Sequence, residues 1–132
     1  MEIRQVYGFI FNAKGEILLM EDKGEYNLPG GRPENGENYA ETLIREAGEE
    51  VQVRIKSIEY LGYQLITDAE KFAQVRMVCR IDEILPSKTD PSTGKTYSRF
   101  WVSPEHANEL LEWSESGDGQ IESAISRASR WR

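Results

Sequence analysis

This sequence of 132 residues contains a single cysteine, Cys79, and a single histidine, His106. One cysteine excludes both an internal disulfide and a cysteine-based metal cage. Cys79 stands in an alternating apolar segment, which predicts a buried and unreactive thiol. His106 falls in the first turn of a predicted surface helix. We therefore expect any catalytic base to be a carboxylate.

Long apolar runs and a signal-peptide pattern are also missing. No stretch approaches the ~20 apolar residues that span a membrane, and the start, MEIRQVYGF, lacks a basic region followed by an apolar one. The net charge is −7, from 23 acidic and 16 basic residues, which argues against a nucleic-acid polymer as partner. The expectation is a cytoplasmic protein of one domain, residues 1–132, that binds no membrane. A small anionic ligand stays compatible with this charge if a metal ion mediates its binding.

Apolar periodicity and turn residues predict the order of the elements. Strands are expected at 2–12, 16–20, 55–66, 72–84 and 96–102, with a turn at 67–71. Helices are expected from Asn38 to about residue 51, after the cap Ser103 with Pro104 in its first position, and at about 121–130. The stretches 26–37, 86–95 and 114–120 are expected to lie outside helices and strands. This mixture predicts an α/β fold, a mixed sheet flanked by helices in the α/β/α manner.

The first predicted helix concentrates its charge on one side. Its apolar stripe consists of Ala40, Leu43, Ile44, Ala47 and Val51. Glu46, Glu49 and Glu50 occupy a neighbouring arc at i, i+3 and i+4, where like charges repel by a few tenths of a kcal/mol per pair. Gly48 costs roughly 1 kcal/mol more relative to alanine. Glu50 lies nearest the apolar stripe and is expected to be partly buried.

Three carboxylates beside a core predict a site for a hard divalent cation, because such a cation takes oxygen ligands and turns their repulsion into attraction. The alternative is a solvated acidic helix face, on which Arg45 pairs with Glu41 one turn earlier. The preceding loop, GGRPENGE, favours the cation site, because flexible backbone at a helix N-terminus can meet a metal or a phosphate.

The 23 residues from Gly31 to Val53 resemble the Nudix box of the Nudix hydrolases. That box has the form Gly, five residues, Glu, seven residues, then Arg-Glu-apolar-any-Glu-Glu-any-Gly-apolar. The matching positions are Gly31, Glu37, Arg45, Glu46, Ala47, Glu49, Glu50 and Val53. Gln52 stands where the family usually has the glycine that ends the helix, so this departure concerns the helix end and leaves the carboxylates untouched. The resemblance extends over roughly residues 3 to 113.

This resemblance implies a Nudix-type α/β/α sandwich and the metal-dependent hydrolysis of a phosphoanhydride bond in a nucleoside di- or triphosphate-type substrate. Magnesium or manganese is the implied cofactor. The implied metal ligands are Glu46, Glu49, Glu50 and the backbone carbonyl of Gly30. Glu37 and Arg45 are implied as structural or orienting partners of that cluster. A non-catalytic Nudix-fold module that binds a nucleotide is the alternative, and a plain α/β protein with a solvated acidic helix is a third.

Three questions stay open at this level. The general base is sought among Glu46, Glu70, Asp82 and Glu83. The substrate and the oligomeric state, a homodimer included, are not determined, although a small chain of this length is similar to the members that hydrolyse nucleoside triphosphates.

Aromatic residues that can stack on a base are Tyr7, Tyr26, Tyr63, Tyr97, Phe100 and Trp101. The segment STGKT resembles the end of a P-loop, but Thr89 stands where that motif needs glycine.

Overall fold

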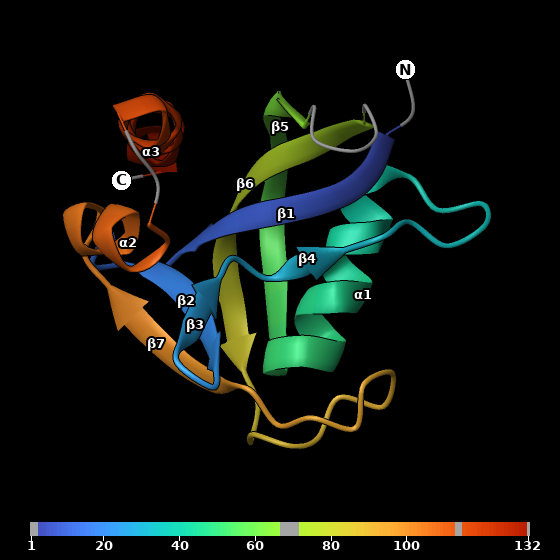
Figure 1. The fold of residues 1–132 in the computed structure, drawn as a ribbon. Coiled ribbons are helices and arrows are strands. Elements are labelled where there is room, and N and C mark those ends of the chain that lie inside the picture. The colour runs from blue at the N-terminus through green and yellow to red at the C-terminus, as the bar shows by residue number, and fades with distance from the viewer. Residues whose placement is uncertain (1–2, 67–71, 113–114, 132) are drawn as a thin grey trace.

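The computed structural model describes residues 3–66, 72–112 and 115–131. A seven-stranded mixed sheet forms the centre, with the order β3-β2-β1-β6-β5. β4 pairs with β1, and β7 pairs with β2. β1 runs parallel to β6, whereas the other pairs are antiparallel. Helix α1 covers one side of the sheet, and α2 and α3 lie on the other (Figure 1). The predicted α/β/α architecture is confirmed.

The elements follow the chain in alternating blocks. The strands are β1 (Ile3–Phe11), β2 (Ile17–Asp22), β3 (Glu25–Asn27), β4 (Gly30–Gly31), β5 (Val53–Ile66), β6 (Phe72–Ile84) and β7 (Ser98–Val102). The helices are α1 (Tyr39–Val51), α2 (Pro104–Leu110), α3 (Glu115–Ala128) and the 3₁₀ turn η1 (Ser129–Trp131). Both predicted N-caps are present: Asn38 caps α1 in a capping box with Glu41, and Ser103 caps α2.

Alternation along the central strand produces two apolar clusters. In β1, Val6 and Ile10 point to one face and Phe9 and Phe11 to the other, as the two-residue period of a strand requires. The cluster beneath α1 adds Leu18, Leu43, Ala47, Val51, Val75 and Cys79. The cluster beneath α2 and α3 adds Ile17, Leu19, Val78, Ala107, Ile121 and Ala124. Cys79 is fully buried, and this burial raises the pKa of its thiol, which confirms the prediction of an inert cysteine.

Two predicted boundaries were wrong. The stretch 26–37, expected to be a loop, contains the end of β3 and the short strand β4, because Gly30 and Gly31 pair with Tyr7 and Val6 of β1. Helix α3 begins at Glu115, within the segment 114–120 that was expected to break the chain. Its face with Ile121, Ala124 and Ala128 packs on the sheet, and such burial outweighs the poor helix propensity of its glycines. The predicted turn at 67–71 lies outside the described residues.

The buried face of α1 is rotated from the predicted stripe toward the glutamates. Ile44, predicted to be buried, is 49% exposed, whereas Thr42 and Glu50 are buried. The reason is β4, which lies beside α1 (Figure 1) and contacts Glu50 through the backbone N–H of Gly30. Across the described part of the chain, no helix is both long and apolar enough to cross a membrane.

Candidate active site

The two glycines of β4 bring the chain close to α1. A Cβ atom on Gly30 would lie 2.1 Å from the backbone oxygen of Val6, and one on Gly31 would lie 2.6 Å from Cδ of Glu46. Only glycine therefore fits at position 30, whereas a side chain at position 31 would have to displace the Glu46 carboxylate. Residues without side chains at these positions let Glu46 and Glu50 reach the β4 backbone.

Glu50 is the most buried member of the glutamate cluster. Its side chain points under β4, where the backbone N–H of Gly30 donates a hydrogen bond of 2.8 Å to Oε1. The residue is 8% exposed. The pKa of Glu50 is raised to about 8: burial is the largest cause, the charges of Glu46, Asp90 and Glu49 act in the same direction, and the Gly30 N–H opposes them. At neutral pH this carboxyl is therefore mostly protonated unless a cation compensates its charge.

Arg45 holds the rest of the cluster together. Its Nε and Nη2 donate to both carboxylate oxygens of Glu37, at 2.7 and 3.1 Å. Its Nη1 lies 2.8 Å from Glu46 Oε1 and 3.6 Å from Glu49 Oε1, and Nη2 also donates to the backbone oxygen of Arg32. The structure does not contain the alternative ion pair between Arg45 and Glu41. Instead Glu41 accepts a hydrogen bond from the Asn38 backbone in the capping box.

The pKa values of Glu37 and Glu46 move in opposite directions. Hydrogen bonds from Arg45 and from the Glu34 backbone lower the pKa of Glu37 to about 2. Burial raises the pKa of Glu46, although Arg45 partly opposes this effect. Glu37 is thus a permanently charged anchor for the arginine, whereas Glu46 and Glu50 retain protons more readily than ordinary carboxyls.

A fourth carboxylate, Asp90, joins the cluster from the loop between β6 and β7. It is 2% exposed, and its charge raises the pKa of both Glu46 and Glu50. The Ser92 backbone N–H donates to Asp90 Oδ1, and the Ser92 hydroxyl donates to Glu49 Oε2 at 2.9 Å. Nothing in the sequence singled out Asp90. The one sequence feature at Asp90 is its place as the first residue of the segment DPSTG, and such a segment usually indicates a simple surface turn.

Gln52 ends α1 in the left-handed conformation, with φ 52° and ψ 49°. Glycine favours this conformation, so the departure from the Nudix box is accommodated without moving the helix end. The Gln52 side chain donates to the Glu49 backbone oxygen at 2.8 Å and accepts from the Lys88 backbone at 3.1 Å. Arg99 of β7 donates to the backbone oxygens of Val51 and Leu85, at 3.1 and 2.7 Å. The side chain of Gln52 therefore fixes the loop that carries Asp90 onto the end of α1.

A pocket of about 150 Å³ is lined by Tyr7 of β1, the residue that pairs with Gly30 of β4. Its lining includes Tyr7, Tyr26 and Arg76. The guanidinium of Arg76 lies 5.3 Å from the centre of the Tyr7 ring. Burial raises the pKa of Tyr7, and the nearby charge of Glu50 raises it further. Tyr7 and Tyr26 are thus the two predicted aromatic residues that border a cavity near the cluster.

The remaining predicted base candidates lie elsewhere. Asp82 and Glu83 are exposed at the end of β6, where they pair with Lys56 and Arg54 of β5. Neither residue is among the charges that perturb Glu46 or Glu50. These observations do not bring Asp82 or Glu83 into the glutamate cluster. Glu70 falls outside the described residues.

The donor set of the cluster suits a hard divalent cation, because it consists of carboxylate oxygens beside an open backbone, and the pKa values of Glu46 and Glu50 are raised. Among the described residues, no three acidic, histidine or cysteine side chains converge on one point. Each carboxylate is instead occupied by a protein donor: Arg45 at Glu46, Ser92 at Glu49 and the Gly30 backbone at Glu50. The carboxylate oxygens are chemically suited to a cation. To bind one, these side chains must give up their hydrogen bonds from protein donors.

Comparison with known proteins gives concordant matches. A family model described as the NUDIX domain matches residues 1–122. A Bacillus subtilis (strain 168) protein, provisionally named 8-oxo-dGTP diphosphatase YtkD, is 39% identical over 104 residues, covering 79% of this chain and 65% of that protein. The NAD-capped RNA hydrolase NudC of Pseudomonas fluorescens (strain Pf0-1) is 36% identical over 81 residues, covering 52% of this chain and 29% of NudC. The chain thus matches less than two thirds of the length of either relative.

Solved structures share the fold. A NUDIX hydrolase from Nitrosomonas europaea superposes with a TM-score of 0.76 and 18% identity, covering 96% of this chain and 90% of that one. At this identity the likeness establishes the architecture alone. It agrees with the helix–sheet–helix arrangement in Figure 1.

Proposed function

This chain belongs to the Nudix family, and we propose that it hydrolyses a phosphoanhydride bond in a small nucleotide at the glutamates of α1. The observation that carries the proposal is the placement of Glu50. This carboxyl is buried against the Gly30 backbone with three other carboxylates close enough to raise its pKa. A fold that keeps such a costly group beside open glycine backbone is well suited to a reaction that brings a cation with its substrate.

The cation would be held by Glu46, Glu49, Glu50 and the backbone carbonyl of Gly30. When bound, magnesium or manganese supplies charge neutralisation on the phosphate oxygens and a more acidic water. Arg45 positions Glu46 and Glu49 through its hydrogen bond and ion pair. Glu37 acts through Arg45, because its bidentate pair fixes the plane of the guanidinium.

Asp90 adds negative charge from outside the box. Its burial and its influence on Glu46 and Glu50 support a role in the same cluster. Asp82 and Glu83 form ion pairs with residues of β5. Among the described carboxylates, Glu46 and Asp90 are therefore best placed to accept a proton from the attacking water. Glu46 keeps one Arg45 hydrogen bond that favours its charged, proton-accepting form.

The nucleoside would occupy the pocket beside Tyr7 and Tyr26. An aromatic ring can stack on a base, and the pocket adjoins Gly30 through the pairing of Tyr7 with that residue. The name of the Bacillus relative supports nucleoside triphosphates as the first class to test.

The decisive experiment is a phosphate-release screen of nucleoside di- and triphosphates with and without magnesium. The expected result is metal-dependent turnover of at least one compound by the wild-type chain and none above background by Glu50→Gln. The competing proposal is a nucleotide-binding module without catalysis, and it draws on the protein donors that already occupy the three carboxylates. Tight nucleotide binding in excess chelator, with no product at high protein concentration, would favour that module.

A further inference from the structure

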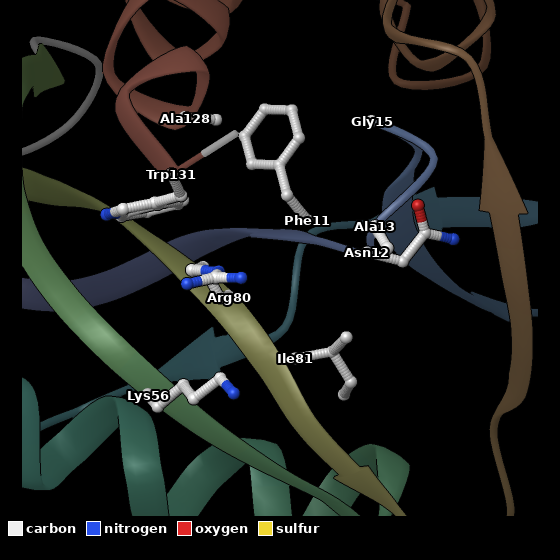
Figure 2. Close-up of a pocket in the computed structure, with 9 residues that line it drawn as sticks. All are labelled: Phe11, Asn12, Ala13, Gly15, Lys56, Arg80, Ile81, Ala128 and Trp131. Carbon is white, nitrogen blue, oxygen red and sulfur yellow. The ribbon is translucent and has the colours of Figure 1, made fainter.

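A second cavity, of about 580 Å³, lies away from the glutamate cluster. Its wall includes Phe11 of β1 and Ala128 of α3, which both belong to the apolar cluster beneath α2 and α3. Helix α1 lies on the opposite side of the sheet (Figure 1). The cavity is lined by none of the glutamates of α1 and shares no residue with the pocket beside Tyr7 and Tyr26. Figure 2 shows the side chains that line it.

Two cations face each other at this cavity. Lys56 of β5 stands directly opposite Arg80 of β6 in the antiparallel register, and both side chains line the cavity. Like charges directly opposite each other on neighbouring strands are destabilising. The chain as a whole carries a net charge of −7, so this pair runs against its general composition.

The two cations are only partly compensated by the protein. Lys56 Nζ lies 3.7 Å from Asp82 Oδ1, and both side chains of this pair are about half exposed. Arg80 lies 5.7 Å from the centre of the Trp131 ring, and within the described ranges no carboxylate forms an ion pair with it. Figure 2 shows the Trp131 indole over the Arg80 guanidinium, with Lys56 on the other side of Arg80. The indole orders the guanidinium but supplies no counter-charge.

The other polar lining residue, Asn12, is engaged in its own turn. Its Oδ1 accepts from the backbone N–H groups of Lys14 and Glu16, and its Nδ2 donates to Glu16 Oε1 at 2.9 Å. The polar side chains left to meet a ligand are therefore the two cations. An occupant that matches them must carry concentrated negative charge.

We propose that this cavity binds a phosphate group, which Lys56 and Arg80 hold and Trp131 borders. A guanidinium offers paired donors to phosphate oxygens, and an ammonium adds a point charge at their side. The phosphate is either a free ion, such as inorganic phosphate or pyrophosphate, or the phosphate of a nucleoside monophosphate. The site acts as a second anion site, separate from the glutamates of α1.

The test is a titration of the full chain in excess chelator, because without a cation the acidic cluster of the other site offers an anion no counter-charge. The probes are inorganic phosphate, pyrophosphate, AMP and adenosine at constant ionic strength. The signal is the indole N–H resonance of Trp131, identified as the one that Trp131→Phe removes. Arg80→Gln and Lys56→Gln are compared with Arg54→Gln, which removes the same charge from β5 at a residue outside this cavity.

We expect saturable binding of phosphate to the wild type and to Arg54→Gln, and affinity at least ~10-fold weaker in Arg80→Gln and Lys56→Gln. Tighter binding of AMP than of phosphate assigns the site to a nucleotide, and equal binding assigns it to the free ion. Both outcomes support the proposal. Shifts that never saturate, an equal loss in Arg54→Gln, or adenosine binding as tightly as AMP would overturn it. Thermal melting checks the fold of each variant, and Lys56→Gln, at a half-exposed residue, keeps the test decisive if Arg80→Gln unfolds.

Discussion

Glu50 accepts a hydrogen bond of 2.8 Å from the backbone N–H of Gly30, twenty residues earlier in the chain. This bond joins the face of α1 to the short strand β4 and keeps the carboxyl beneath the glycines. The pKa of Glu50 is raised to about 8, chiefly by burial. The bond therefore connects a carboxyl that protonates readily with the backbone proposed to meet the cation.

Replacement of Glu50 by glutamine should remove catalysis without unfolding the chain. Glutamine keeps an oxygen for the Gly30 N–H but loses the charge that a cation needs, so activity should fall by ~10²-fold or more. Glu41→Gln is the matched control, because Glu41 is exposed and glutamine preserves its capping-box bond. Steady-state kinetics with magnesium decide the point, and equal activity of the two variants would remove Glu50 from the metal site.

The same carboxyl should make the metal-free protein less stable as the pH rises. Between its ordinary pKa of 4.5 and its folded value of about 8, the folded chain holds a proton that the unfolded chain has released. The free energy of unfolding therefore decreases through this window and levels off above it. Glu50→Gln should lack this contribution and melt at a higher temperature than the wild type at pH 8.5. Thermal melts from pH 5 to 9 in chelator measure it, and parallel profiles would contradict the assignment.

Metal affinity should increase with pH over the upper part of the same range. A cation binds the ionised carboxylate, so magnesium must displace the Glu50 proton below pH 8. Calorimetry at pH 6.5, 7.5 and 8.5, in buffers of different ionisation enthalpy, should show proton release that declines toward pH 8.5. Affinity that is constant with pH and binding that releases no proton would show that Glu50 is not a ligand.

Arg45→Lys should destabilise the chain more than a charge-conserving change at the surface. Lysine cannot reproduce the fork that contacts Glu37, Glu46 and the Arg32 backbone, and it leaves the acidic side chains less well compensated. We expect the melting temperature to fall by ~5 °C or more. The control Arg54→Lys alters only the exposed pair with Glu83 and should shift it by less than ~2 °C. Similar shifts of melting temperature in both variants would mean that the Arg45 contacts contribute little to the stability of the chain.

The end of α1 gives a separate test of Gln52. Gln52→Ala keeps the left-handed backbone and loses the bonds to Glu49 and Lys88, so it should cost ~2 kcal/mol of unfolding free energy. Gln52→Gly loses the same bonds but relieves the backbone, so its cost should be only ~1 kcal/mol. Urea denaturation provides both values. If glycine proved the more damaging substitution, the role given to the left-handed conformation would be wrong.

Local patterns in the sequence determined much of the fold and part of the candidate site. The α/β class, the main strands, both helix caps and the spacing of Glu46, Glu49 and Glu50 follow from periodicity and from residues a few positions apart. Such signals act over one or two turns, which is the range that local propensity and hydrogen bonding reach.

The sequence predicted that Leu43, Ala47 and Val51 are buried, but the tertiary structure alone decided how far the buried face of α1 turns from Ile44 toward Glu50, what Arg45 contacts and which carboxylate joins the box from outside. β4 has no strand signal of its own, and its two glycines pair with β1 at a place where a Cβ on Gly30 would clash with β1 and one on Gly31 with Glu46 of α1. That contact rotates the buried face away from Ile44 and toward Glu50. Asp90 is forty residues distant in sequence and reaches the cluster because Gln52 and Ser92 attach its loop to α1. Burial and electrostatic coupling depend on distance in space, and a linear pattern contains no record of that distance until the chain has folded.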